Sequence, residues 1–443
     1  MKHKKIKMTA LFISAIACLC ACTPAIDNGL TRSPLEHLTI PDAVPTNENA
    51  GQAASDENEN ISDKTTANEN PSDGSMSDST GTDSNPQGLA QDSFDSTSQP
   101  GVTGFSEDIL TKANTLLTSM TLEEKVGQMF LARCPETDGA NQAAAYHLGG
   151  YVLFGRDFEN KTEEQVISDI QSYQSSSAIP MFIAVDEEGG TVIRVSSNSQ
   201  LRPYPFWSPQ ELFAEGGFEL VSSDAEDKSV LLKHLGINLN LAPVCDVSTN
   251  ASDYMYQRSF GQPAAETAEY VTTVVGAMNR QGMGSTLKHF PGYGNNVDTH
   301  EGIARDSRSY ETFTESDFLP FQAGINENAT SVLVSHNIVE CMDSEKPASL
   351  SPAVHDILRN DLGFDGIIMT DDLSMEAILQ YTDGQNAAVL AVLAGNDIIC
   401  CTDFTTQIPA VIDAVNTGVI SETRIDQAVL RILASKIELG IIQ

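Results

Sequence analysis

Short apolar runs alternate with longer amphipathic stretches along the chain from about residue 106 onward. Eight such runs occur, each short and mostly apolar, as expected for parallel β-strands that are buried on both faces. They span residues 126–132, 150–154, 181–185, 237–241, 285–289, 331–334, 366–370 and 397–401. This pattern predicts repeated strand–helix units rather than a β-sandwich.

Helical periodicity lies between the predicted strands. Residues 162–175 and 264–280 carry apolar side chains three and four positions apart, and residues 407–442 leave room for one or two closing helices. Eight units in roughly 340 residues suit a barrel of eight strand–helix repeats, for which about 250 residues is typical. The rival is the doubly wound open sheet, but no predicted strand is followed by GxGxxG. We predict an α/β fold with a single (β/α)8 barrel of the TIM type and no second domain.

The chain before residue 106 has a different composition. Residues 41–105 consist largely of Ser, Asn, Asp, Thr, Gly and Gln, and Lys64 is their only basic residue. Such a segment buries too little apolar surface to offset the entropy lost on folding, which predicts a disordered tether. We expect a signal peptide at residues 1–21, a disordered acidic linker at 22–105 and the barrel at 106–443.

The charge balance excludes one class of partner. The chain has 25 Lys and Arg against 61 Asp and Glu, a net charge of -36. Binding to a phosphate backbone requires clustered Lys and Arg that displace counterions. Nucleic acid is therefore not an expected partner, and the acidity is expected to form a solvated surface.

The N-terminus carries a secretion signal. Lysines precede an apolar run at residues 8–20, which is too short to span a membrane but suits a signal peptide. The following sequence, Leu19-Cys20-Ala21-Cys22, resembles the bacterial lipobox. By that resemblance Cys22 is lipidated, and the protein is extracytoplasmic and anchored to the cell membrane through that lipid alone. The alternative is an ordinary signal peptide cut nearby, with Cys22 unmodified.

The cysteines of the barrel segment give no disulfide or zinc pattern. They are odd in number and have no CxxC spacing, and several lie in apolar runs, which favours buried free thiols. They are Cys134, Cys245, Cys341, Cys400 and Cys401.

Polar clusters follow four of the predicted strands. They are residues 186–190 (DEEGG), 288–292 (KHFPG), 335–337 (SHN) and 370–372 (TDD). A buried strand that ends in charged groups is costly unless those groups face a site. A structural ion pair or a capping Asp would explain any one cluster equally well, but several clusters on one barrel face favour an active site.

Longer motifs surround these clusters. They are residues 120–129 (MTLEEKVGQM), 185–190 (VDEEGG), 241–244 (LAPV) with Asp246, 258–261 (RSFG), 288–292 (KHFPG) and 363–372 (GFDGIIMTDD). In these motifs the sequence resembles glycoside hydrolase family 3, and within it the β-N-acetylhexosaminidase branch. The resemblance covers residues 120–440 and implies a retaining glycosidase on a (β/α)8 barrel.

Asp371 occupies the position of the family nucleophile, the first Asp after the strand and its Thr. A carboxylate at the carboxyl end of a strand can point rigidly at an anomeric carbon and form a glycosyl ester. The alternative role for Asp371 is a helix N-cap. We assign the cap to Asp372 instead.

The acid/base is assigned to His300, with Asp298 as the residue that orients it. The hexosaminidase branch has an Asp-x-His dyad on the loop after KHFPG, and this chain has Asp298-Thr299-His300. An imidazole can both give and take a proton near neutral pH, and a carboxylate fixes which ring nitrogen faces the substrate. The alternative is a surface histidine in a loop.

By the same resemblance, substrate contacts fall on four residues, which are Asp186, Arg258, Lys288 and His289. For Arg258 and Lys288 the alternative is a buried ion pair behind the site, and for His336 direct contact and a supporting role remain equally open. Three other histidines have no such context and are expected to be structural: His147, His234 and His355. The chain departs from the branch at Tyr293, where Gly-His-Gly is usual, and at Thr191, where Gly-Gly-Arg is usual, which leaves loop closure and leaving-group preference open.

The leading hypothesis is an exo-acting β-N-acetylglucosaminidase on cell-wall muropeptides or related glycans, acting as a monomer without a cofactor or metal. A β-glucosidase and a phosphorylase of the same family are alternatives, the latter because a histidine acid/base repels phosphate less than a carboxylate does. A sugar-binding lipoprotein without activity is the alternative from another class. A metal-dependent hydrolase is disfavoured because HExxH is absent.

Overall fold

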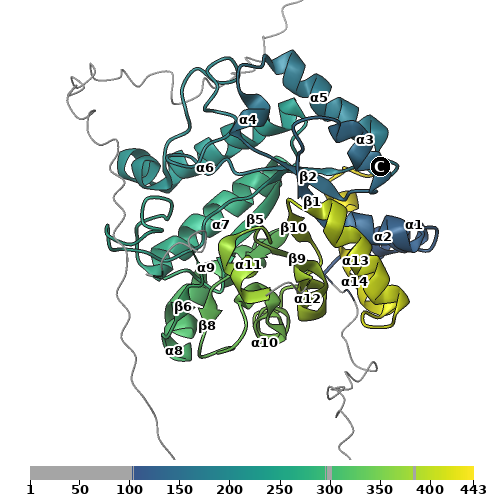
Figure 1. Cartoon of the computed structure of the whole chain (residues 1–443). Helices are drawn as coiled ribbons and strands as arrows, with labels where there is room; N and C mark the ends of the chain where they lie inside the picture. Colours follow the sequence, from purple (N-terminus) through teal and green to yellow (C-terminus); the bar gives the residue numbers. More distant parts are fainter. Residues whose placement is uncertain (1–101, 103, 295, 297–301, 383–385) are drawn as a thin grey trace, which may run out of the picture. The chain divides into compact units, whose positions relative to one another are not determined.

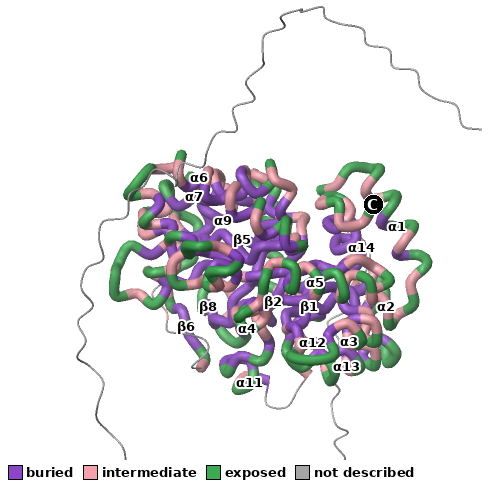
Figure 2. The backbone as a smooth tube through the Cα atoms, turned by 90° about the horizontal axis from the view of Figure 1, so that it is seen from above, coloured by how far each residue is buried: buried purple, intermediate pink, exposed green. Residues whose placement is uncertain are grey.

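A computed structural model describes residues 102, 104–294, 296, 302–382 and 386–443. The predicted signal peptide, Cys22, almost all of the linker, Asp298 and His300 lie outside these residues. The chain divides into two units, and all described residues belong to the second, Gln91–Gln443. In this unit the strands form the buried centre, while the outer faces of the helices are exposed (Figure 2).

Eight parallel strands form one sheet in the order β10-β1-β2-β3-β4-β5-β7-β9 (Figure 1). They are β1 Phe130–Arg133, β2 Gly150–Leu153, β3 Phe182–Val185, β4 Leu239–Asn240, β5 Gly284–Phe290, β7 Ser331–Val334, β9 Ile367–Thr370 and β10 Ile399–Cys401. A parallel bridge between Met369 and Ile398 joins the two edges. The predicted (β/α)8 barrel is therefore confirmed.

One strand boundary was predicted wrongly. The run at residues 126–132 was expected to be a strand throughout, but residues 126–128 belong to helix α2, Leu122–Gln128. The side chain of Thr121 accepts from the N–H of Glu124, and the Glu124 carboxylate accepts from the N–H of Thr121 at 2.8 Å. This capping box starts a helix and delays β1 to Phe130.

Helices surround the barrel (Figure 1). The longer ones are α1 Glu107–Leu117, α5 Glu163–Ser176, α6 Pro209–Leu235, α7 Ala264–Arg280, α9 Phe318–Asn326, α12 Ala387–Ala394, α13 Phe404–Asn416 and α14 Glu422–Glu438. The predicted helices at residues 162–175 and 264–280 correspond to α5 and α7, and the two closing helices are α13 and α14. Helix α7 packs between α6 and α9, and α14 packs against α1.

Short elements complete the described chain. They are α3 Gly139–Ala145, α4 Gly155–Phe158, α8 Tyr310–Thr312, α10 Pro352–Asp356 and α11 Glu376–Thr382, the π-helical segments η2 Phe313–Asp317 and η4 Ile357–Asp361, the 3-10 turn η3 Ala348–Leu350, and a two-stranded parallel sheet of β6 Arg305–Asp306 and β8 Ile338–Val339. The small sheet joins the loop after β5 to the loop after β7. It therefore braces the segments that carry candidate site residues.

Candidate active site

Strand ends that are far apart in the sequence meet at one face of the barrel, as parallel barrel strands require. The candidate residues there are Asp186 and Glu188 after β3, Asp246 after β4, Lys288 and His289 in β5, His336 after β7 and Asp371 after β9. Arg258 reaches this face from the loop between β4 and α7. All substrate contacts named from the sequence therefore belong to one face.

Lys288 is the centre of a buried ion cluster. Its Nζ lies 2.6 Å from Oδ1 of Asp186 and 2.7 Å from Oε1 of Glu188. Burial lowers the pKa of Lys288, but the two carboxylates outweigh it and raise that pKa, so the ammonium stays charged. The Lys288 side chain is 2% exposed and that of Asp186 is 18% exposed. Asp186 is thus the member of the pair that offers carboxylate surface to a ligand.

Arg258 completes the cluster by contacting both carboxylate oxygens of Glu188. Its Nε donates to Oε2 of Glu188 at 3.1 Å and its Nη2 donates to Oε1 at 2.7 Å. Burial raises the pKa of Glu188, but Lys288 and Arg258 outweigh burial and lower that pKa to about 2. The two alternatives for Arg258 and Lys288 are therefore not exclusive, because both cations form a buried ion cluster that lies at the site face.

Two adjacent glutamates have different roles. Oε2 of Glu187 accepts the N–H groups of Arg194 at 2.8 Å and Val195 at 2.7 Å, so Glu187 holds that loop. Glu188 joins the ion cluster, and it was not among the residues named from the sequence. The available signal was the alternation of side chains along an extended chain, which puts Asp186 and Glu188 on the same side.

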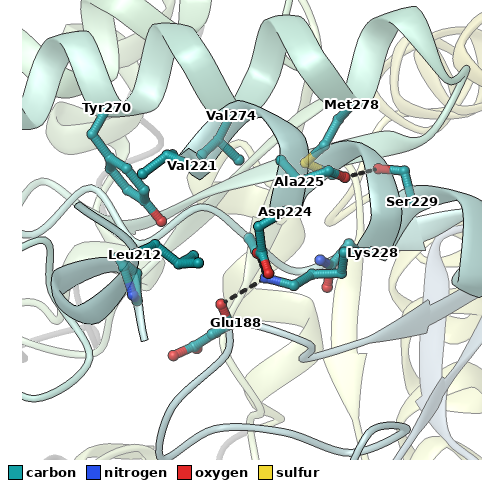
Figure 3. Close-up of a pocket in the computed structure, with 13 residues that line it drawn as sticks. Glu188, Leu212, Val221, Asp224, Ala225, Lys228, Ser229, Tyr270, Val274 and Met278 are labelled. Carbon is teal, nitrogen blue, oxygen red and sulfur yellow. Dashed lines mark hydrogen bonds and ion pairs between the residues drawn. The ribbon is translucent and has the colours of Figure 1, made fainter. Parts of the chain in front are cut away.

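A small cavity lies behind Glu188, between α6 and α7 (Figure 3). Lys228 reaches across it and donates to the carbonyl oxygen of Glu188 at 3.0 Å, while its Nζ lies 3.1 Å from Asp224. The carboxylate of Glu188 points away from this cavity (Figure 3). Lys228 therefore fixes the main chain of Glu188 on the cavity side, while Arg258 and Lys288 hold its carboxylate.

His289 is oriented by Asp246. Nδ1 of His289 lies 2.7 Å from Oδ2 of Asp246, and Oδ1 of Asp246 accepts the N–H of Tyr293 at 2.8 Å. Because a carboxylate oxygen accepts, Nδ1 of His289 donates the hydrogen in this bond. Nε2 lies 3.4 Å from Nη2 of Arg258. Asp246 was noted in a motif without a role, and its role is to fix this imidazole.

Asp371 lies at the carboxyl end of β9, half-buried. Its Oδ1 accepts the N–H of Asp372 at 2.8 Å. Burial raises the pKa of the Asp371 carboxyl, but His336, His289, that N–H and Lys288 outweigh burial and hold the pKa below its ordinary value. Asp371 is therefore an ionised carboxylate near neutral pH, held beside the cluster of predicted substrate contacts.

Asp372, the residue after Asp371, closes a local turn. Asp372 accepts from the N–H and hydroxyl of Ser374 at 2.9 and 2.8 Å and from the hydroxyl of Thr402 at 2.9 Å. The assignment of Asp372 as a helix cap was wrong, because α11 begins only at Glu376. A carboxylate two residues before Ser374 forms a local turn instead.

His336 supports the Asp371 segment. Its Nδ1 lies 2.7 Å from the hydroxyl of Ser349, and its Nε2 lies 3.0 Å from the carbonyl oxygen of Asp372. A carbonyl only accepts, so Nε2 carries a hydrogen and donates it to Asp372. Both ring nitrogens are thus engaged by protein atoms, which favours the supporting role that was left open.

Asp298 and His300, the predicted dyad, lie among residues 297–301, which the structure does not describe. The described parts of the loop on both sides of them are held by hydrogen bonds. Arg308 donates to the carbonyl of Gly292 at 3.1 Å and to both oxygens of Asp317 at 3.0 Å. Asn296 donates to Asp306 at 3.0 Å. A Cβ on Gly292 would lie 2.3 Å from Oδ1 of Asp317, and its φ is 126°, so only glycine suits this close approach.

Two other described histidines make their contacts outside this cluster. His355 is buried in α10 and hydrogen-bonds Ser351, while His234 pairs with Glu163 at the surface. The described cysteines are free, and all but Cys341 are buried, so the expectation of buried thiols is wrong for that one residue.

The described residues contain neither a metal-binding cluster nor a candidate membrane-spanning helix. Within residues 102–443, apart from the undescribed positions, no three His, Cys, Asp or Glu side chains are arranged to hold a metal ion. Over the same positions, no helix is both long and apolar enough for a bilayer span.

Comparison with known proteins decides the family. The model of the glycosyl hydrolase family 3 N-terminal domain matches residues 121–435, which include every described site residue. The chain belongs to glycosyl hydrolase family 3. It is therefore a glycoside hydrolase, and the family resemblance read from its motifs is confirmed.

Several members of the family are similar in sequence or structure to more than half of this chain. A β-hexosaminidase of Nitrosomonas eutropha is 31% identical over 261 residues, which are 58% of this chain and 74% of the relative. The β-hexosaminidase LpqI of Mycobacterium tuberculosis is 29% identical over 71% of this chain and 82% of its own. A solved family 3 β-N-acetylglucosaminidase from Paenibacillus is 31% identical with a TM-score of 0.67, over 73% of this chain. The present chain spans 63% of that solved chain.

Proposed function

We propose that this hydrolase removes terminal β-linked N-acetylglucosamine with retention of configuration, through a covalent intermediate on Asp371. The observation that carries the proposal is an ionised Asp371 beside a cluster of charged residues on the face where barrel active sites lie. The names of the similar hexosaminidases and of the solved N-acetylglucosaminidase support the sugar.

The first step breaks the glycosidic bond. An oxygen of Asp371 attacks the anomeric carbon, a glycosyl ester forms, and the leaving oxygen takes a proton from His300. In the second step His300 takes a proton from water as that water attacks the anomeric carbon, the bond from that carbon to Asp371 breaks, and the Asp371 carboxylate is regenerated. Asp298 keeps one imidazole nitrogen directed at the leaving oxygen.

The ion cluster is assigned to substrate positioning. Asp186 accepts sugar hydroxyl groups, and Arg258, whose side chain is partly exposed, donates to the same sugar. His289, which Asp246 orients, contacts a hydroxyl of that sugar. These charged contacts hold the ring so that the anomeric carbon faces Asp371.

A substrate panel tests the sugar. We expect aryl β-N-acetylglucosaminide to be cleaved at least about 100-fold more efficiently, in kcat/KM, than the matching aryl glucoside, because a buried polar site discriminates strongly. Added phosphate should leave the rate unchanged and water should be the acceptor. A preference for the glucoside, or release of a sugar phosphate, would contradict the proposal.

The proton role of His300 has its own test. His300→Ala should slow an alkyl glycoside about 100-fold or more and an activated dinitrophenyl glycoside far less in the glycosylation step, because only the poor leaving group needs the proton. The matched control is His234→Ala, which changes a surface histidine and should leave both rates unaltered. Equal losses on both substrates would exclude an acid role for His300.

We also propose that the enzyme is a lipoprotein with a catalytic domain tethered to Cys22. The support is the lipobox-like sequence around Cys22 and the polar composition of residues 41–105. Metabolic labelling with a fatty-acid analogue should modify the wild-type protein and fail to modify Cys22→Ser. Equal labelling of both proteins would contradict the anchor, without bearing on the chemistry of the barrel.

A further inference from the structure

Two arginines at the mouth of the barrel have no ion-pair partner among the described residues. Arg133 is the last residue of β1, and Arg194 lies in the loop after β3. Their guanidinium carbons lie 4.5 and 5.9 Å from the centre of the Phe154 ring. The Nε atom of each arginine is buried without a hydrogen-bond partner. Within the described chain, the side chains of this pair donate one hydrogen bond, from Arg194 to the carbonyl of the adjacent Ile193 at 3.4 Å. Both side chains are only partly buried, so their remaining nitrogen atoms can donate to a ligand.

The acids near this pair are engaged elsewhere. The carboxylate of Glu187 accepts the main-chain N–H groups of its own loop, including that of Arg194. Asp157 interacts electrostatically with Arg133, but it lies 3.7 Å from Arg156 and accepts a main-chain N–H at 2.7 Å. The two guanidinium groups around Phe154 are at most about 10 Å apart, comparable with the Debye length in dilute salt, so they repel each other. In a chain of net charge -36, two neighbouring cations without a paired acid would be stabilised by a bound anion.

The strand geometry directs Arg133 and Phe154 toward the barrel axis. The Tyr151 hydroxyl donates to the carbonyl of Gly139 in α3 at 2.8 Å, so Tyr151 points outward to the helices. Side chains alternate along an extended chain, which turns Val152 and Phe154 inward. Arg133 is the register partner of Val152 in the adjacent parallel strand, so it points inward as well. The pair of charges therefore faces the interior of the mouth, where the candidate active site lies.

This anion site is next to a proposed sugar contact. Leu153 of β2 is the register partner of Val185 in β3, so Phe154 and Asp186 follow at the same level of two adjacent strands. Adjacent strands are about 5 Å apart, which puts Asp186 within one sugar ring of Phe154. Asp186 is paired with Lys288 at 2.6 Å, so its charge is offset and does not exclude an anion beside it.

The order of the strands also fixes which end of the sugar faces the two arginines. Asp371 follows β9, and the loop after β5 contains the proposed acid/base His300, so the anomeric carbon must lie between those two strand ends. The ring order places β7 between β5 and β9, and it places β2 across the mouth from β7. The edge of the sugar that is remote from the anomeric carbon therefore faces Phe154 and Arg133.

We propose that Arg133 and Arg194 bind an acidic substituent of the terminal sugar, carried on a carbon remote from the anomeric centre. This proposal rests on the proposed function and specifies its substrate class as N-acetylhexosamines that bear a carboxylate or a phosphate. A planar guanidinium group donates to both kinds of anion, and the Phe154 ring holds the two arginines in place by cation–π contact.

Three aryl β-glycosides with one common leaving group test the inference and distinguish the two anions. Their sugars are N-acetylglucosamine, its 6-phosphate, and its 3-O-lactyl ether, which carries a carboxylate. In dilute salt, kcat/KM for at least one acidic glycoside should exceed that for the neutral glycoside about 10-fold. The ratio should fall toward 1 in about 1 M salt, because salt screens partly exposed charges. The methyl ester of the lactyl glycoside keeps the bulk without the charge, so it should show no advantage over the neutral glycoside.

Variants of the pair separate charge recognition from a structural role. Arg133→Met and Arg194→Met should each bring the ratio of acidic to neutral kcat/KM toward 1, mainly by raising KM for the acidic glycoside. Arg133→Lys keeps the charge and should retain part of the ratio. The matched control is Arg280→Met, which removes a 56% exposed arginine that pairs with Glu226 and should leave the ratio at the wild-type value.

Two results would overturn the inference. One is a wild-type enzyme that prefers neither acidic glycoside, and the other is a wild-type ratio in both methionine variants. If Arg133→Met fails to fold, which its melting temperature reports, the ratio in Arg194→Met decides. A wild-type enzyme that cleaves none of the three glycosides would instead refute the proposed function itself.

Discussion

Charged clusters lie at both ends of the barrel, and they differ in access. At the carboxyl ends of the strands, Lys288 and Arg258 hold Glu188 and Asp186, and part of Asp186 and of Arg258 reaches the surface. At the amino ends, Asp397 is fully buried, and three arginines surround it: Arg359, Arg424 and Arg431. Both clusters are dense in charge, but only the first can meet a substrate.

The hydrogen bonds of the second cluster, which consists of Asp397 and its three arginines, indicate a structural role. Oδ2 of Asp397 accepts the N–H of Ile368 in β9 at 3.1 Å, and Arg359 donates to the carbonyls of Phe364 and Gly366. Arg424 donates to the carbonyl of Val392 at 3.2 Å. This cluster ties β9, the start of β10 and α14 together where the barrel closes. A cluster of ionisable groups with shifted pKa values therefore indicates a functional site only where one of its polar atoms is accessible to a ligand.

The largest expected effect concerns the nucleophile beside the first cluster. Asp371→Asn should lower kcat by about 10⁴-fold or more while sugar binding and the melting temperature stay near wild type, because only the attacking oxygen is lost. Steady-state kinetics and calorimetric titration with N-acetylglucosamine measure the two parts. A variant with more than a tenth of wild-type kcat would show that another group attacks.

The second cluster should respond in stability. Asp397→Asn removes the carboxylate that pairs with three guanidinium groups and should cost about 3–5 kcal/mol in free energy of unfolding. Denaturant titration measures that loss, and kcat of the protein that remains folded should be unchanged. The milder Arg431→Met keeps Asp397 paired with two arginines and should cost less. A wild-type stability for Asp397→Asn would contradict the structural role.

The same substitution in the first cluster should act on catalysis. Asp186→Asn leaves Lys288 paired with Glu188, so the expected stability loss is smaller than that of Asp397→Asn. The loss of a charged acceptor for sugar hydroxyls should lower kcat/KM about 100-fold. If Asp186→Asn lost stability as Asp397→Asn does and kept its activity, the contrast between the two ends would fail.

The smallest effect is a pH dependence at the amino end. Lys436 is fully buried, its Nζ donates to Oε1 of Gln128 at 2.8 Å, and burial lowers its pKa to about 7. The unfolded chain binds this proton up to about pH 10, so the penalty of burying the amine is constant below pH 7 and shrinks as pH rises. Lys436→Met should therefore stabilise the protein more at pH 6 than at pH 9, by a difference of about 2 kcal/mol. A gain that does not change between these pH values would show that Lys436 stays charged.

The architecture was predictable because each strand is a buried apolar run of the right length. The first strand was misplaced because the apolar pattern continues through Val126 into α2, although Thr121 and Glu124 have capping-box spacing. Periodicity alone does not separate a buried helical turn from a strand. The capping residues outweighed the apolar pattern at this point.

The site was predictable only in part. The polar clusters that contain Asp186, Lys288, His289 and Asp371 were noticed because they follow buried strands, and the family resemblance supplied the expected roles. The structure brings these residues to one face. Glu188 was missed because the alternation that puts it on the same side as Asp186 was not applied, and nothing in the sequence shows that Lys288 of β5 meets both carboxylates. The ion cluster around Asp397 was not predicted either. Its three arginines come from helical segments whose positions relative to Asp397 the sequence does not reveal.

Trapping the covalent intermediate tests the central claim most directly. The wild-type enzyme incubated with a 5-fluoro-N-acetylglucosaminyl fluoride should gain the mass of one sugar, and peptide sequencing should place that sugar on Asp371. Asp371→Asn should remain unlabelled, and labelling should reverse as activity returns. An adduct on another carboxylate, or turnover with inverted configuration and no adduct, would contradict the account.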